Sequence, residues 1–214
     1  CGFSGCSDYA NAIVKNGVPT NLCKPGGKEC AAKLSALMGI ANMDVVPQVA
    51  VVLCSGDCNA TESKFNFNGI QSCLAANRFY NGSEVCTHGC LGFGDCAKVC
   101  PNNAISIVDG LARVNKSECI GCGLCSKVCP DNLIVLRDIT NHVDVCCSST
   151  DIGKITRSVC SSGCIGCKKC ENGAITVENN HASIDYSKCT NCGKCVEACP
   201  MHVIKKCDAA VIAK

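Results

Sequence analysis

One cysteine pattern occurs twice in this chain of 214 residues and constrains its fold more than any other feature. The pattern reads Cys-x-x-Cys-x-x-Cys-x-x-x-Cys-Pro and covers residues 119–130 and 189–200. The chain holds 26 cysteines but no tryptophan, five phenylalanines and three tyrosines, so it has few large side chains to fill a core. We therefore expect bonds made by cysteine to hold much of the structure together.

The spacing of the cysteines decides between disulfides and metal sites. A repeated gap of two residues suits a loop that wraps a metal cluster, whereas a disulfide framework has no reason to repeat it. The third cysteine and the Cys-Pro pair favour the bacterial ferredoxin pattern for 4Fe–4S clusters over structural zinc. The sequence thus predicts 4Fe–4S clusters bound by thiolates, in a reducing compartment.

The formal charge of +2 counts every cysteine as neutral. Four thiolates around an oxidised cluster bring about −2 per cluster, because the ligands must lose their protons. The loaded protein would then be acidic, and the chain has no basic aromatic stripe, so we expect no nucleic-acid partner. No apolar run approaches the ~18 residues that are needed to span a bilayer.

An internal repeat organises the cysteines. The four cysteines of the first run recur 70 residues later, and the same offset maps Cys100 onto Cys170. Further upstream the offset is 74 residues, which maps residues 86–90 onto residues 160–164. The repeat predicts two versions of one ferredoxin-like module.

The expected fold class is α+β, with short strands, cluster-wrapping loops and short helices after the third cysteine of each run. Apolar pieces predict strands at 49–53, 104–108, 133–136, 174–177 and 203–204. The predicted organisation is a small N-terminal helical iron–sulfur unit at 1–42, a connecting block at 43–83, a bacterial-type two-cluster ferredoxin-like module at 84–137, a linker at 138–157, a second such module at 158–206 and a tail at 207–214.

In a two-cluster ferredoxin, three closely spaced cysteines wrap one cluster and the remote fourth cysteine binds the other cluster. This rule predicts one complete site from the second half of each module. The two expected ligand sets are Cys100, Cys119, Cys122 and Cys125 in the first module, and Cys170, Cys189, Cys192 and Cys195 in the second.

The first half of each module departs from this spacing. Phe93 stands where a ligand is expected, and Cys86 is the natural substitute. The preferred sets are Cys86, Cys90, Cys96 and Cys129 in the first module, and Cys160, Cys164, Cys167 and Cys199 in the second. An alternative groups Cys164, Cys167 and Cys170, and it leaves the neighbouring cluster one ligand short.

The remaining cysteines have less regular spacing. Cys1, Cys6 and Cys23 lie near glycines that let the backbone approach a cluster, so we expect a fifth cluster whose fourth ligand precedes Cys1. Cys54, Cys58 and Cys73 either take part in a sixth cluster that recruits Cys86 or are buried structural cysteines. We expect no ligand role for the other four: Cys30, Cys146, Cys147 and Cys207. No catalytic constellation is visible, so the chain is expected to move electrons without transforming a substrate itself.

Several segments resemble the B subunit of the Rnf complex, in the cluster-rich form of clostridia and acetogens. They are Cys1-Gly-Phe-Ser-Gly-Cys6, Cys23-Lys-Pro-Gly-Gly27, Gly89-Cys-Leu-Gly-Phe-Gly-Asp-Cys96 and Gly163-Cys-Ile-Gly-Cys167. The resemblance implies a membrane complex that oxidises reduced ferredoxin, reduces NAD⁺ and exports Na⁺ or H⁺. It also implies partner subunits, a place at the cytoplasmic face of the membrane of an anaerobic bacterium, and a membrane helix that precedes this fragment.

Two other interpretations compete with this one. The first is a soluble polyferredoxin or the cluster subunit of another anaerobic oxidoreductase. The second is a zinc-binding module without redox activity. If the chain binds 4Fe–4S clusters, its small number of large apolar side chains predicts that the cluster-free chain does not fold, because metal binding supplies folding free energy.

Overall fold

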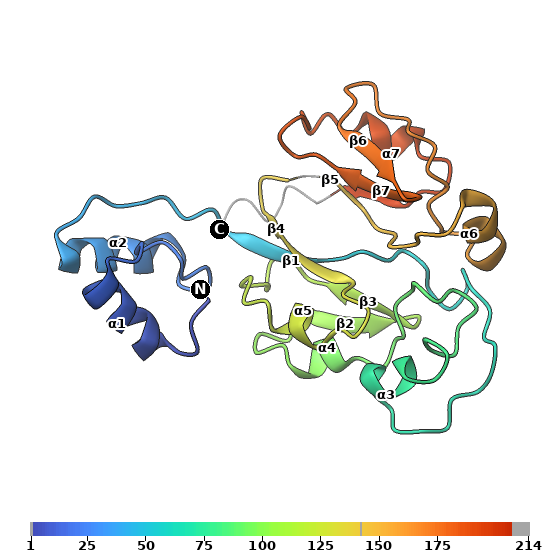
Figure 1. The fold of residues 1–214 in the computed structure, drawn as a ribbon, viewed down its shortest axis with the longest axis horizontal. Coiled ribbons are helices and arrows are strands. Elements are labelled where there is room, and N and C mark those ends of the chain that lie inside the picture. Colours follow the sequence, from blue (N-terminus) through green and yellow to red (C-terminus); the bar gives the residue numbers. More distant parts are fainter. Residues whose placement is uncertain (1, 142, 207–214) are drawn as a thin grey trace.

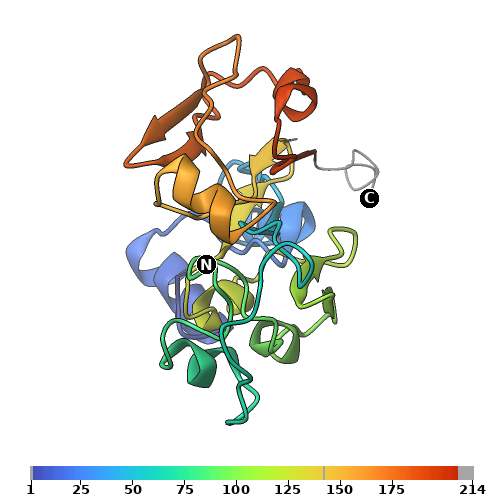
Figure 2. The same ribbon diagram turned by 90° about the vertical axis from the view of Figure 1, so that its right-hand side faces the viewer.

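The computed structural model describes residues 2–141 and 143–206 of the chain. Two helices near the N-terminus stand apart from a larger body of short strands, helices and loops, and an extended segment joins the two parts (Figure 1). After a quarter turn, the orange and red C-terminal elements lie on one side of the green and yellow elements (Figure 2).

The N-terminal part consists of helices α1 (Cys6–Asn16) and α2 (Gly27–Met38). Gly17 ends α1 with a φ of 62°, in the left-handed region that glycine adopts without strain. Tyr9 of α1 is buried, and its hydroxyl donates a hydrogen bond of 2.8 Å to the Pro19 carbonyl oxygen. This bond fixes the start of the loop that leads to α2.

Each expected module contains a β-hairpin. β2 (Ile105–Val108) pairs with β3 (Leu111–Val114), and β6 (Ile175–Glu178) pairs with β7 (His181–Ile184), both antiparallel. The two residues between the strands have positive φ in both hairpins, as a tight turn that follows the twist of the strands requires. The two hairpins are thus built in the same way, 70 residues apart.

A second antiparallel pair accompanies each hairpin. β1 (Gln48–Val52) pairs with β4 (Ile134–Asp138), and β5 (Val143–Val145) pairs with β8 (Ile204–Lys206). In both cases the first strand precedes the module in the sequence and the second strand closes it. The segments expected to be a connecting block and a linker therefore each contribute a strand to the module that follows.

Short helices occur beside the cysteine loops: α3 (Cys73–Asn77), α4 (Asp95–Lys98), α5 (Leu124–Val128), α6 (Gly153–Val159) and α7 (Lys194–Ala198). α5 and α7 carry the third cysteine of each run within their first turn, close to where the sequence predicted them. The second module has no counterpart of α4 among its described residues, because its chain is four residues shorter there.

Each module has a small core in which cysteines pack among aliphatic side chains. The buried members are Ala50, Cys96, Ile105, Ala112, Cys125 and Ile134 in the first module, and Val143, Val145, Ala182, Cys199, Val203 and Ile204 in the second. The predicted mixed fold with short strands is confirmed in this coarse form.

Across the two described stretches, none of the helices has the length and apolar character needed to cross a membrane.

Candidate iron–sulfur sites

The first complete ligand set from the sequence gathers around one pocket. Cys100, Cys119, Cys122 and Cys125 all line it, together with side chains of β1, β2 and β4. Backbone N–H groups donate to two of the sulfur atoms, from Ala50 to Cys119 Sγ and from Ala104 to Cys100 Sγ, both at 3.3 Å. Such donors stabilise the negative charge that a ligand thiolate carries.

The second complete set gathers in the equivalent place. Cys170, Cys189, Cys192 and Cys195 line one pocket beside β6 and β7. A tight turn at Lys168, with a φ of 55°, lets Cys170 take the remote position although α4 has no counterpart here. Glu171 follows Cys170, whereas Pro101 follows Cys100 in the first module. This difference does not move the Cys170 sulfur atom out of its expected group.

Burial and mutual repulsion shape the pKa values in these two groups. Burial raises the pKa of Cys125 to about 11, and the neighbouring Cys119 and Cys122 add to the rise. The exposed Cys192 differs, because the backbone N–H of Lys194 and the Thr190 hydroxyl lower the pKa of its thiol. The two groups therefore present the same four-sulfur arrangement in different electrostatic surroundings.

In the first half of the first module, the cysteines that lie together differ by one from the preferred set. Cys73, Cys90, Cys96 and Cys129 line one pocket, and Cys86 lies elsewhere. Burial raises the pKa of Cys96 to about 12, with further contributions from Cys90, Cys73 and Cys129. The structure therefore places Cys73 where we expected Cys86.

Two hydrogen bonds explain how helix α3 brings Cys73 to this group. Asp95, at the start of α4, accepts a bond of 3.3 Å from Leu74 N–H, next to Cys73. At the other end of α3, Asn77 donates a bond of 2.6 Å to Asp131, close to Cys129. Phe93, which occupies the ligand position in the sequence, packs instead against Phe67 with ring centroids 5.5 Å apart.

The first half of the second module retains three of its four expected cysteines. Cys164, Cys167 and Cys199 line one pocket, and the fourth sulfur at that pocket belongs to Cys195 of the neighbouring group. Cys160 lies elsewhere, beside Cys86, and the side chains of these two cysteines hydrogen-bond to each other. The alternative that joins Cys170 to this group does not match the structure, since Cys170 lies with Cys195.

The N-terminal unit gathers a cysteine that we had expected to have no ligand role. A methyl group at Gly26 would lie 2.9 Å from Cys30 Sγ and 3.0 Å from Cys23 Sγ, so the two sulfur atoms flank this glycine. Burial raises the pKa of Cys30, and the charges of Cys23 and Cys6 raise it further. The group therefore contains Cys6, Cys23 and Cys30, whereas Cys1 lies outside the described residues.

The cysteines proposed for a sixth site do not form one group. Cys73 belongs to the pocket described above, and Cys54 accepts a hydrogen bond of 3.4 Å from Cys90 N–H. Cys58 is exposed, beside the hairpin turn at Gly110. Cys146 is buried next to Cys147, whose sulfur accepts a bond from Cys164 N–H, and Cys207 lies outside the described residues.

The groups of thiols supply the sulfur ligands that 4Fe–4S clusters require. Within residues 2–141 and 143–206, no three His, Cys, Asp or Glu side chains converge closely enough to hold one metal ion. A 4Fe–4S cluster is larger than one ion, and its thiolate ligands stand further apart. Pockets lined by several sulfur atoms, with N–H donors directed at those atoms, match that requirement.

Comparison with protein families supports the same chemistry. A model described as a 4Fe-4S dicluster domain matches residues 80–136, and models described as 4Fe-4S binding domains match residues 161–173 and 182–205. A further model, for an Fe–S cluster, matches residues 1–25. The chain is therefore an iron–sulfur protein with several 4Fe–4S domains.

Comparison with curated proteins narrows this class. The chain is 42% identical to the B subunit of the ion-translocating oxidoreductase complex of Methanosarcina acetivorans, over 96% of this chain and 80% of the relative. It is also 42% identical to the B subunit of the proton-translocating ferredoxin:NAD(+) oxidoreductase complex of Clostridium ljungdahlii, over 96% of this chain and 75% of the relative. With the Na(+)-translocating counterpart of Acetobacterium woodii, identity is 41% over 95% of this chain and 63% of the relative. The chain belongs to this family, the B subunits of ion-translocating oxidoreductase (Rnf) complexes.

Proposed function

We propose that this chain relays electrons within a membrane-bound, ion-translocating ferredoxin:NAD⁺ oxidoreductase. It accepts them from reduced ferredoxin and passes them on through its 4Fe–4S sites. The observation that carries the proposal is the series of adjoining cysteine groups, in which Cys195 lines the pockets of two neighbouring groups. Relatives whose names state ferredoxin:NAD(+) oxidoreductase activity support the choice of donor and acceptor.

The protein's own residues hold and insulate the sites. A 4Fe–4S cluster, when bound, accepts and donates one electron at a time. The cysteine thiolates anchor it, and backbone N–H groups such as that of Leu133, 3.4 Å from Cys129 Sγ, stabilise the charge on the sulfur atoms. Aliphatic side chains of the two small cores limit the access of water to the sites.

Five clusters follow from the groups that the sequence analysis anticipated. Four lie in the two ferredoxin-like modules, and one lies in the N-terminal unit. The revised ligand sets are Cys73, Cys90, Cys96 and Cys129; Cys100, Cys119, Cys122 and Cys125; Cys164, Cys167 and Cys199; Cys170, Cys189, Cys192 and Cys195; and Cys6, Cys23 and Cys30 together with Cys1.

The partners follow from the proposed role. Reduced ferredoxin supplies electrons, and other subunits of the complex receive them. The chain works at the cytoplasmic face of the membrane, held there by its partner subunits. The names of the relatives support both Na⁺ and H⁺ as the exported ion.

Electron uptake by the purified chain tests the relay. The chain is prepared anaerobically with its clusters, its iron and acid-labile sulfide are measured, and enzymatically reduced ferredoxin is added while the cluster absorbance is followed. We expect about four irons per cluster and a loss of absorbance that saturates with added ferredoxin. Bound zinc without sulfide, or clusters that ferredoxin cannot reduce, would refute the proposal.

The membrane association needs its own test in cells. The native complex is extracted from membranes with mild detergent, and the chain is traced by an antibody. It should sediment with the membranes and co-purify with integral subunits. Recovery of the whole pool from the soluble fraction, with no bound partner, would instead identify a soluble polyferredoxin.

A further inference from the structure

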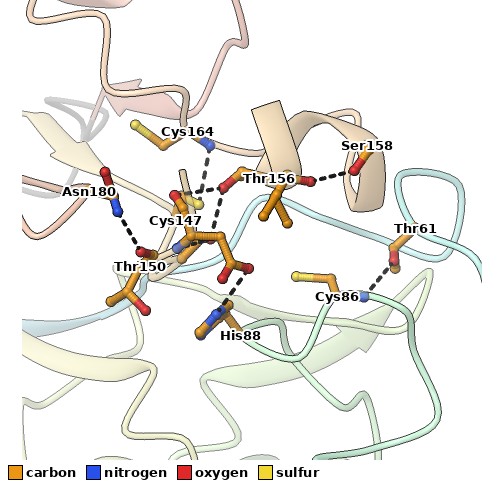
Figure 3. A network of polar contacts seen from close by, with 12 residues as sticks. Thr61, Cys86, His88, Cys147, Thr150, Thr156, Ser158, Cys164 and Asn180 are labelled. Atoms are coloured by element: carbon orange, nitrogen blue, oxygen red, sulfur yellow. Dashed lines mark hydrogen bonds and ion pairs between the residues drawn. The ribbon is translucent and has the colours of Figure 1, made fainter. Parts of the chain in front are cut away.

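Four cysteines from four separate segments meet where the two ferredoxin-like modules face each other. The side chains of Cys86 and Cys160 hydrogen-bond to each other. A methyl group at Gly56 would lie 3.0 Å from Cys160 Sγ and 4.0 Å from Cys54 Sγ, so both sulfur atoms lie next to this glycine. Cys147 lies close enough to these cysteines for electrostatic interaction. Its charge raises the pKa of Cys160, and the charge of Cys86 raises the pKa of Cys147. Figure 3 shows Cys86 and Cys147 beside one polar network.

The four cysteines are arranged as two equivalent pairs, one from each module. Cys54 follows strand β1, and Cys147 follows its counterpart β5. Cys86 stands four residues before Cys90, just as Cys160 stands four residues before Cys164. An internal repeat therefore presents one pair of thiols from each side of the boundary.

The hydrogen bonds at the two pairs are equivalent as well. Cys54 Sγ accepts from Cys90 N–H at 3.4 Å, and Cys147 Sγ accepts from Cys164 N–H at 3.3 Å. In each module the donor is the first cysteine of the neighbouring cluster loop. Donors of this kind at sulfur are a feature of iron–sulfur sites, where they stabilise thiolate charge and tune the potential.

Contacts between the modules hold the pairs in place. The Ser148 hydroxyl donates to the Leu53 carbonyl oxygen at 2.9 Å, which ties the residue after Cys147 to the residue before Cys54. Ser161 N–H, next to Cys160, donates to the Ala60 carbonyl oxygen at 2.8 Å. His88 Nε2 lies 3.3 Å from Asp151 Oδ2, beside Cys86 and the segment after Cys147 (Figure 3).

We propose that Cys54, Cys86, Cys147 and Cys160 together bind a further 4Fe–4S cluster at the boundary between the two modules. A Cys86–Cys160 disulfide would leave Cys54, Cys147 and their N–H donors without a role, whereas a cluster uses all four sulfur atoms. The site deepens the proposed electron relay and rests on it. Because its N–H donors, Cys90 and Cys164, are themselves members of the adjoining groups, it would connect the clusters of one module to those of the other.

Serine substitutions at the four positions test the ligand set. Each of Cys54→Ser, Cys86→Ser, Cys147→Ser and Cys160→Ser should lower the iron content of the anaerobically purified chain by about four atoms and remove the same component of the reduced EPR spectrum. The matched control is Cys58→Ser, since Cys58 is exposed and belongs to the same segment as Cys54. Full iron content in all four variants would overturn the proposal, because these cysteines would then hold no cluster.

A second measurement uses the unaltered holoprotein and does not depend on how the variants fold. The protein is treated briefly with N-ethylmaleimide under anaerobic conditions, and labelled cysteines are mapped by mass spectrometry before and after iron removal by a chelator. We expect Cys58 to be labelled at once, and Cys54, Cys86 and Cys147 to be labelled only after iron removal. Labelling of those three in the iron-loaded protein, at the rate of Cys58, would exclude the site.

The two proposals can fail separately. If the chain binds the other clusters and is reduced by ferredoxin, yet Cys54, Cys86 and Cys147 remain reactive, only the boundary site is wrong. If the unaltered chain contains no iron and sulfide, the relay itself is wrong, and the boundary site fails with it.

Discussion

Arg137 Nε donates a hydrogen bond of 3.0 Å to Asp144 Oδ1, and this contact joins strand β4 of the first module to strand β5 of the second. Asp144 is 1% exposed, and the Tyr186 hydroxyl donates to the same carboxylate. Arg137 also lies over the Tyr186 ring, 5.3 Å from its centroid. A buried carboxylate with two donors is thus a fixed link across the boundary at which the four cysteines gather.

Removing this carboxylate should destabilise the folded protein strongly. Breaking a buried ion pair from one side costs about 3–5 kcal/mol, because the remaining charge loses its partner. We therefore expect Asp144→Ala to lower the free energy of unfolding of the cluster-loaded chain by about 3 kcal/mol, measured by anaerobic denaturant titration. The control is Glu29→Gln, which removes an exposed pair with Lys33 and should cost less than about 1 kcal/mol. Equal losses in the two variants would contradict the structural role of Asp144.

Much of the local structure could be predicted from the sequence, because it depends on short-range spacing. The Cys-x-x-Cys runs fix three neighbouring ligands through the reach of one loop, so the groups around Cys122 and Cys192 were found directly. Five of the eight described strands, β1, β2, β4, β6 and β8, were found because short apolar pieces between turn residues bury one strand face, whereas β3, β5 and β7 were not predicted. Helix α1 of the predicted helical N-terminal unit ends at Gly17, whose left-handed conformation is typical of a glycine at a helix end.

The positions of the remaining cysteines depend on contacts between distant segments, which the spacing along the sequence does not encode. Asp95 helps to hold Cys73 near Cys96, because it accepts a hydrogen bond from Leu74 N–H in the first turn of α3, although it comes from another part of the chain. Cys147 lies near Cys86 because β5 occupies in the second module the place of β1 in the first. One sequence signal could have revealed it: Cys54 and Cys147 each follow a short apolar strand at the entrance to a module.

The role of Cys73 can be separated from that of Cys86 by substitution. Cys73→Ala should remove the cluster held by Cys90, Cys96 and Cys129, whereas Cys86→Ala should leave that cluster in place. The two variants should therefore lose different EPR components and about four irons each. Full iron content in Cys73→Ala, together with loss of the Cys90, Cys96 and Cys129 cluster in Cys86→Ala, would restore the ligand set inferred from spacing and would make Cys73 an ordinary buried residue.

Gly121 is a position where the backbone of another strand leaves no room for a side chain. Its φ is 64°, and a methyl group there would lie 2.4 Å from the Gln48 carbonyl oxygen of β1. Gly121→Ala should displace β1 from the loop that carries Cys119 and Cys122, and should lower stability by about 2–3 kcal/mol with loss of that cluster.

Gly193→Ala is the matched control for this clash. Gly193 also has a positive φ, 77°, but a methyl group there would meet nothing within 4 Å. It should cost only the conformational strain, about 1 kcal/mol, and keep all clusters. If Gly193→Ala were as damaging as Gly121→Ala, strain alone would account for both, and the close approach of β1 would be irrelevant.

Cluster assembly should accelerate as the pH rises. Iron and sulfide must displace protons from the thiols, which are mostly protonated at neutral pH. Where a segment folds before its cluster is bound, burial raises the pKa of Cys54 and of Cys96 to about 12, so still fewer of these thiols are ionised. Below these pKa values each pH unit increases the thiolate fraction about tenfold, so assembly limited by one thiolate should become about tenfold faster from about pH 7 to about pH 8.

The two modules should differ in this pH dependence. Neighbouring donors, first the Lys194 N–H, lower the pKa of Cys192, whereas burial raises that of Cys125 to about 11. At a given pH a larger fraction of Cys192 is therefore ionised, and its group should assemble at lower pH than the Cys125 group, measured in variants that retain one group, with Cys119→Ser or Cys189→Ser removing the other. The raised thiol pKa values also make the stability of any folded cluster-free chain depend on pH, and here higher pH is unfavourable. The folded form keeps its full stability below the thiol pKa of the unfolded chain, about 9, and loses this contribution as the pH rises toward the folded-state pKa of about 12. Assembly rates that fall with rising pH in both modules would contradict thiol deprotonation as the limiting step.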